Sequence, residues 1–160
     1  LGWIRADHEL IQRIARVRYS SDLGTPVLDQ LVVLELLGEF DRILADRRAY
    51  LRAGRDHLLA RLGDRLPEWA LPEPDGGLTL WVNLGAPLSS QLALAARNEG
   101  LVIAAGPRFG MNGVFERFLR VPYSHPPELI DRAVDALEAA WSVVTRHSVA
   151  LGQEDLAEVV

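Results

Sequence analysis

Apolar residues recur at helical spacing near the start of the chain. Leu10, Ile14 and Val17 stand three or four positions apart, which predicts a helix over this stretch. Asp7 lies just before the pattern and is expected to be the N-cap, because its carboxylate can accept hydrogen bonds from the first free N–H groups. Residues 1–4 are apolar and look like the end of a buried strand, as if the chain were cut from something longer.

A second helix is predicted at residues 27–37, which are apolar on most faces. Thr25 and Pro26 are typical of a helix start, with Thr25 as the N-cap and Pro26 in the first turn. A helix with apolar residues on most faces needs cover, so we expect it to be buried in a core or at a subunit interface.

A long amphipathic helix is predicted from residue 41 to residue 66. Its polar faces carry seven arginines and four aspartates. Such a helix could bind DNA, but the acids are interleaved and no aromatic residues are placed to stack on bases. We therefore expect a solvated, ion-paired face. The apolar stripe consists of Ile43, Leu44, Leu51, Leu58, Leu62 and Leu66.

Alternating apolar and polar residues replace the helical pattern after a Pro/Gly-rich turn at residues 66–77. The short connections favour strands that neighbour one another. The predicted fold class is α/β with an α+β small domain, in which a sheet of three or more strands is covered by helices on one face. The predicted elements are a strand at 78–84, a helix from Ser89 or Ser90 to 99 closed by Gly100, strands at 101–105 and 118–123, and a helix from 126 to about 147.

The composition argues against several classes of function. The 160 residues carry a net charge of −5, so direct nucleic-acid binding by this segment is not expected. Cysteine is absent and the four histidines lack ligand spacing, so no disulfide and no metal site are expected. No apolar run is long enough to span a bilayer and no signal-peptide pattern is present. We expect a cytoplasmic protein without a membrane partner.

All 17 residues in the Lys+Arg total are arginines, so the chain contains no lysine. It therefore cannot form a lysine Schiff base by itself or use the lysine of a P-loop. No Gly-x-Ser-x-Gly nucleophile elbow occurs, and we assign no catalytic residue. Glu116 could form a carboxylate pair with another acid, but the sequence alone does not determine whether another acid lies within reach.

Two residues of the second half are candidates for a binding site. Arg120 is the one charged residue in the strand at 118–123, and a guanidinium in a buried strand needs an anionic partner. That partner is either one of the chain's own acids or a carboxylate ligand, which arginine binds through two parallel hydrogen bonds. Phe109 lies in the loop 104–110, where it either walls an apolar pocket or packs on the core.

Several short motifs occur in an order that resembles a known family. Together with the long helix, they make residues 1–146 resemble the C-terminal part of a pyridoxal-phosphate-dependent aspartate-aminotransferase-fold protein. The resemblance is greatest to the effector domain of MocR-type GntR-family transcription regulators, while class I/II aminotransferases and a non-catalytic structural or dimerisation module remain alternatives. The motifs are Leu-Gly-Trp-Ile at 1–4, Gly-Gly-Leu-Thr-Leu-Trp-Val at 76–82, Gly-Pro-Arg-Phe at 106–109 and Phe-Leu-Arg-Val-Pro-Tyr at 118–123.

The resemblance implies roles for both candidate residues. Arg120 matches the arginine that binds the α-carboxylate of the substrate, and Phe109 matches a loop that approaches the substrate. The cofactor-binding lysine and the phosphate-binding arginine would lie immediately upstream of Leu1. Pyridoxal 5′-phosphate is therefore expected in the full-length protein and not on this fragment, which should be inactive alone. The expected partners are an amino acid or another small carboxylate, a second copy in a homodimer, and DNA only through a domain outside this chain.

The resemblance also implies a domain organisation. Residues 1–6 would be the edge of the large cofactor domain, and residues 7–69 a bridging helical segment. Residues 70–147 would form the small α+β domain, and residues 148–160 a tail without an assignable pattern. The apolar stretch 27–37 would pack in the dimer or against the large domain.

Overall fold

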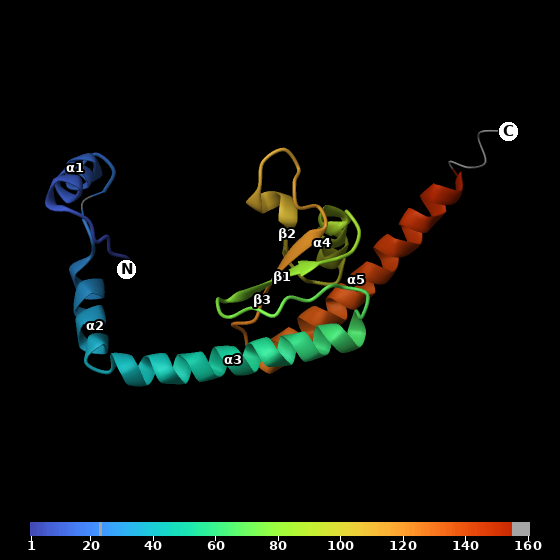
Figure 1. Ribbon diagram of the computed structural model, residues 1–160, viewed down its shortest axis with the longest axis horizontal. Helices are drawn as coiled ribbons and strands as arrows, with labels where there is room; N and C mark the ends of the chain where they lie inside the picture. Colours follow the sequence, from blue (N-terminus) through green and yellow to red (C-terminus); the bar gives the residue numbers. More distant parts are fainter. Residues whose placement is uncertain (23, 155–160) are drawn as a thin grey trace. The chain divides into compact units, whose positions relative to one another are not determined.

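The computed structural model describes residues 1–22 and 24–154, with side chains up to residue 146. The chain divides into two compact units, Leu1–Arg47 and a second unit that begins at Arg48. Figure 1 labels the helices and strands of both. Within the described residues, no helix is both long enough and apolar enough to cross a membrane.

The first helix of the first unit is α1 (His8–Arg18). Asp7 is its N-cap, as predicted, and the Asp7 Oδ1 accepts a hydrogen bond of 2.9 Å from the Leu10 amide. Residues 1–4 do not form the predicted strand. A strand needs a hydrogen-bonded neighbour, and none of the described strands pairs with these residues.

The second helix of this unit is α2 (Val27–Leu37), and its start differs from the prediction. Pro26 is the N-cap without a side-chain hydrogen bond, while the Thr25 hydroxyl accepts a hydrogen bond of 2.9 Å from Arg18. The prediction that this helix is buried in a core is wrong within the described chain, while its burial at a subunit interface stays a prediction. None of its side chains is buried, and Leu28 is 76% exposed.

The second unit is built on a three-stranded antiparallel sheet of β1 (Thr79–Asn83), β2 (Ala104–Ala105) and β3 (Phe118–Pro122). The strand order is β1-β3-β2, so the last strand of the chain lies in the middle. The prediction that successive strands are neighbours is therefore wrong for β1 and β2. β2 is also shorter than the predicted 101–105, because only its two alanines pair with β3.

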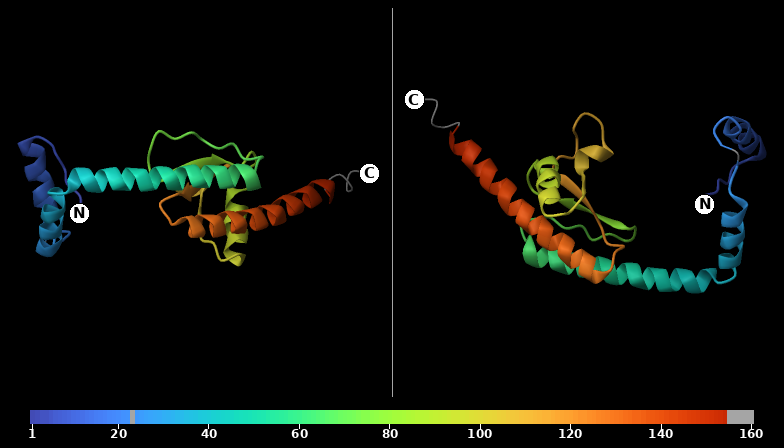
Figure 2. Two further views of the ribbon diagram at one scale, coloured as in Figure 1. Left: turned by 90° about the horizontal axis from the view of Figure 1, so that it is seen from below. Right: turned by 180° about the vertical axis from the view of Figure 1, so that it is seen from behind.

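Helices cover one face of this sheet, as predicted. They are α3 (Phe40–Arg65), of which the part from Arg48 onward belongs to this unit, α4 (Ser89–Asn98) and α5 (Pro127–Glu154). In Figure 2 this part of α3 lies beside α5. Their apolar stripes meet every second side chain of β1 and β3. The core contains Leu58, Leu62, Leu66, Leu80, Val82, Leu92, Ala96, Leu119, Val121, Ile130, Val134 and Leu137.

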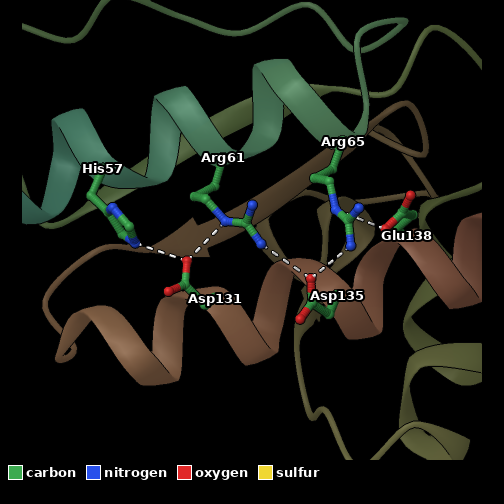
Figure 3. A network of polar contacts seen from close by, with 6 residues as sticks. All are labelled: His57, Arg61, Arg65, Asp131, Asp135 and Glu138. Atoms are coloured by element: carbon green, nitrogen blue, oxygen red, sulfur yellow. Dashed lines mark hydrogen bonds and ion pairs between the residues drawn. The ribbon is translucent and has the colours of Figure 1, made fainter.

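A row of ion pairs, with a hydrogen bond from His57 at one end, joins α3 to α5 (Figure 3). Arg61 lies at its centre, with Nε 2.8 Å from Asp131 and Nη2 3.2 Å from Asp135. The predicted ion-paired face of α3 therefore exists, although several of its acids come from α5 and not from α3. Partly exposed pairs of this kind contribute about 0.2–1 kcal/mol each. The row consists of His57, Arg61 and Arg65 on α3 and Asp131, Asp135 and Glu138 on α5.

The last helix, α5, was predicted as a helix, and it buries an apolar stripe on its inner face. It extends to Glu154 and so includes residues 148–154, where the sequence pattern was too weak to assign a structure. Residues 155–160 of the expected tail lie outside the described residues.

Candidate functional site

Arg120 lies on the face of the sheet that the helices leave open. Its neighbours Leu119 and Val121 are 0% and 2% exposed, and side chains alternate along a strand, so Arg120 points to the opposite face. The prediction that the Arg120 guanidinium is buried and therefore needs an anionic partner was wrong, because only the flanking residues of the strand are buried. The exposed guanidinium is accessible to a ligand on this face.

Two contacts orient the Arg120 guanidinium. Its Nε donates a long hydrogen bond of 3.4 Å to the Thr79 hydroxyl, and its Cζ lies 5.3 Å from the centre of the Phe109 ring. On the β2 side its partner in the register is Ala104, whose side chain is a single methyl group. Among the described residues, no carboxylate forms an ion pair with Arg120.

An aromatic cluster surrounds Trp81, the partner of Arg120 in the β1–β3 register. Its ring stacks on Phe118 with centroids 5.4 Å apart, and it meets Phe109 and Phe115 edge to face at 5.6 Å. Such pairs contribute about 0.5–1.5 kcal/mol each beyond area burial. The cluster therefore holds Phe109 on the open face, where it is 41% exposed, and not in the core.

The loop that carries Phe109 is fixed by close backbone contacts. Gly106, at the start of the turn η1 (Gly106–Phe109), is buried, and a Cβ there would overlap the Phe115 carbonyl oxygen. Glu116 accepts hydrogen bonds of 2.9 Å from both the amide and the hydroxyl of Ser90. Glu116 thus caps α4, and the contacts described for it include no second carboxylate.

Arg120 lines a depression of about 240 Å³. A cation beside small and apolar side chains can bind a carboxylate. A metal site has no such support, because no group of three or more metal-ligating residues occurs among the described residues. Sequence reasoning found Arg120 and Phe109 but missed Thr79, Trp81 and Ala104. The alternation of β1 places Trp81 and Thr79 on one face, but only the strand register places them beside Arg120.

Comparisons with known proteins identify the fold. No family model matches the chain. The 2-aminoadipate transaminase of Thermus thermophilus is 33% identical over 123 residues, which are 74% of this chain and 31% of that protein. The crystal structure of LysN, the α-aminoadipate aminotransferase of the same species complexed with N-(5′-phosphopyridoxyl)-L-leucine, matches with a TM-score of 0.81 at 30% identity, over 88% of this chain and 37% of that one. The chain has the fold of the matched part of these aminotransferases.

This aminotransferase-fold chain is also similar to a regulator of transcription. The HTH-type transcriptional regulator NorG of Staphylococcus aureus is 35% identical over 85 residues, which are 51% of this chain and 19% of that protein. The chain thus spans about a third of the length of the transaminase and about a fifth of the regulator. The predicted resemblance and fold class are confirmed.

Proposed function

We propose that this aminotransferase-fold chain supplies the carboxylate-binding side of a pyridoxal-phosphate site in a longer protein. Arg120 would bind the α-carboxylate of an amino acid or another small carboxylate, and Phe109 would line the same site. The observation that carries the proposal is the exposed guanidinium on the open sheet face, with no ion-paired acid among the described residues. The similar LysN structure holds a phosphopyridoxyl group joined to leucine.

The residues of the chain fit the amino-acid side of such a site and not the covalent anchor of the cofactor. None of the 160 residues is a lysine, so the amine that holds the cofactor would come from outside these residues. When bound, the cofactor supplies an electron-withdrawing ring. Arg120 would bind both carboxylate oxygens and so orient the Cα–H bond, and Thr79 and Phe109 would keep its guanidinium in place.

The whole protein is proposed to be a GntR/MocR-type transcription regulator, with this chain in its ligand-sensing effector domain. The similarity to NorG supports this proposal. DNA would bind through a domain outside the chain, which agrees with the net charge of −5. The protein would act in the cytoplasm as a homodimer, and the exposed apolar residues of α2 would then be covered in the dimer or by the large domain.

An aminotransferase is the alternative, and the longer match favours it. The transaminase is similar over 123 residues, compared with 85 for the regulator. In both cases we propose the same organisation of the chain, with residues 1–6 at the edge of the cofactor domain, residues 7–69 as a bridge and residues 70–147 as the small domain.

The carboxylate-binding role is tested by titrating the full-length, cofactor-loaded protein with an amino acid and following the cofactor absorbance. Arg120→Ala should weaken amino-acid binding by about 10- to 100-fold, because it removes charge-assisted hydrogen bonds. Cofactor affinity should change much less, and Arg132→Ala on the far helix α5 is the matched control. Equal losses of amino-acid and cofactor affinity would return Arg120 to a structural role.

Regulator and aminotransferase are separated by two further observations on the full-length protein. A winged helix-turn-helix encoded upstream of Leu1, together with turnover of L-2-aminoadipate and 2-oxoglutarate close to background, supports the regulator. Steady transamination without such a domain supports the aminotransferase.

A further inference from the structure

A second cavity lies between α3 and the turn before β1, within the second unit. Its volume is about 340 Å³, at the lower end of the 300–1,000 Å³ typical of small-molecule sites. It shares no lining residue with the depression at Arg120. The lining residues are Arg48, Leu51, Arg52, Arg55, Asp75, Gly76, Gly77 and Tyr123.

The cavity is rich in positive charge. Arg48, Arg52 and Arg55 are four and three positions apart on α3, so their side chains share one face of the helix. Arg55 pairs with Asp56 at 2.7 Å, whereas no hydrogen bond or ion pair joins Arg48 or Arg52 to another residue of the described chain. Like charges one turn apart repel each other, and a bound anion would relieve this repulsion.

The hydroxyl group of a nearly buried tyrosine provides a second, independent observation. Tyr123 is 2% exposed and lines the cavity, and its hydroxyl lies 3.9 Å from the position that a Cβ on Gly77 would take. Among the described residues, none hydrogen-bonds to this hydroxyl, and its oxygen is not itself buried, so the hydroxyl is open to the cavity beside the arginines.

We propose that this cavity binds the phosphate group of a small molecule. Guanidinium groups match phosphate oxygens through paired hydrogen bonds, and the Tyr123 hydroxyl would donate one more. Gly76 and Gly77 have no side chains, which leaves room beside the donors, and Asp75 is the only acid among the lining residues. This site goes beyond the proposed function and does not depend on it.

The experiment is calorimetric titration of the full-length protein with inorganic phosphate, at constant ionic strength and after saturation with pyridoxal phosphate. Saturation fills any site for the phosphate of that cofactor, so further binding reports another site. Arg52→Gln should weaken phosphate binding by about tenfold or more, because it removes a charge-assisted contact. Tyr123→Phe keeps the ring and removes only the hydroxyl, and it should weaken binding by about 2- to 10-fold.

Arg132→Gln is the matched control, because it removes the same charge from α5 outside the cavity. It should leave phosphate affinity unchanged, and circular dichroism should confirm the fold of each variant. Absence of saturable phosphate binding to the wild-type protein would overturn the proposal. Equal weakening by Arg52→Gln and Arg132→Gln would also overturn it, because that result reports only net charge. If the protein binds no pyridoxal phosphate, the proposed function fails, and the comparison of variants still decides this site.

Discussion

Gly54 marks a close approach of α3 to the end of the strand that carries Arg120. A Cβ at Gly54 would lie closer than 3.0 Å to the Tyr123 carbonyl oxygen, which real Cβ atoms essentially never do. The Ile130 Cδ1 would be 3.9 Å away, so the new methyl group has no free space on that side. Gly54→Ala should gain about 1 kcal/mol of helix propensity. Overpacking against a backbone group should cost up to about 3 kcal/mol, so we expect a net destabilisation of about 1–2 kcal/mol.

Gly63 offers a matched control on the same helix. A Cβ there would meet only the Leu71 Cδ1 at 3.9 Å, which is ordinary van der Waals contact. Gly63→Ala should therefore stabilise the protein by about 0.5–1 kcal/mol through helix propensity alone. Thermal unfolding followed by far-UV circular dichroism measures both variants. Gly54→Ala should lower the melting temperature by roughly 2–8 °C, and Gly63→Ala should raise it by roughly 1–4 °C.

The test is which of the two variants has the lower melting temperature. If Gly54→Ala unfolds at the same temperature as Gly63→Ala, or above it, α3 does not pack against the Tyr123 carbonyl as described. That result would also weaken the assignment of Tyr123 to the wall of the phosphate cavity.

Two further predictions concern other parts of the chain. Gly106→Ala should displace the loop that carries Phe109 from the aromatic cluster, because the new Cβ would overlap backbone carbonyls. The indole N–H resonance of Trp81 should therefore shift in an NMR spectrum. An unchanged resonance would contradict the described packing. The Arg18 guanidinium, hydrogen-bonded to the Asp22 carboxylate at 2.9 Å, holds the pKa of Asp22 below its ordinary value of 3.8. An NMR titration should find this lower pKa, and Arg18→Gln should raise it. Because the folded pKa is the lower one, the pair contributes fully to stability above the ordinary pKa of 3.8, and this contribution is lost as the pH falls from there through the folded pKa. A measured pKa of 3.8 or higher would contradict the prediction.

The helices could be predicted from the sequence because their determinants are local. The spacing of apolar residues predicted α1, α3 and α5. The Asp7 cap is equally local, because its carboxylate accepts a hydrogen bond from an amide only three residues further along the chain. The strand order could not be predicted in this way. Periodicity says which residues share a face, but β3 enters between β1 and β2 through hydrogen bonds with residues far away in sequence.

Only part of the candidate site could be predicted, because its residue types are visible in the sequence but their contacts depend on long-range structure. Arg120 and Phe109 stand out as residue types in their segments, but their contact depends on a loop fold that needs glycine at position 106. Trp81 reaches Arg120 only through the β1–β3 register. The phosphate cavity had no sequence signal, because the arginines that line it look like the rest of a charged helix.

The central claim is that Arg120 binds the carboxylate of an amino acid. It is tested most directly by comparing L-leucine with 3-methylbutylamine, which lacks only the carboxylate, as ligands of the full-length, cofactor-loaded protein. The wild-type protein should prefer leucine by about 10- to 100-fold, the contribution of charge-assisted hydrogen bonds. Arg120→Ala should reduce this preference to near unity, while Arg132→Ala should preserve it. An unchanged preference in Arg120→Ala would contradict the account.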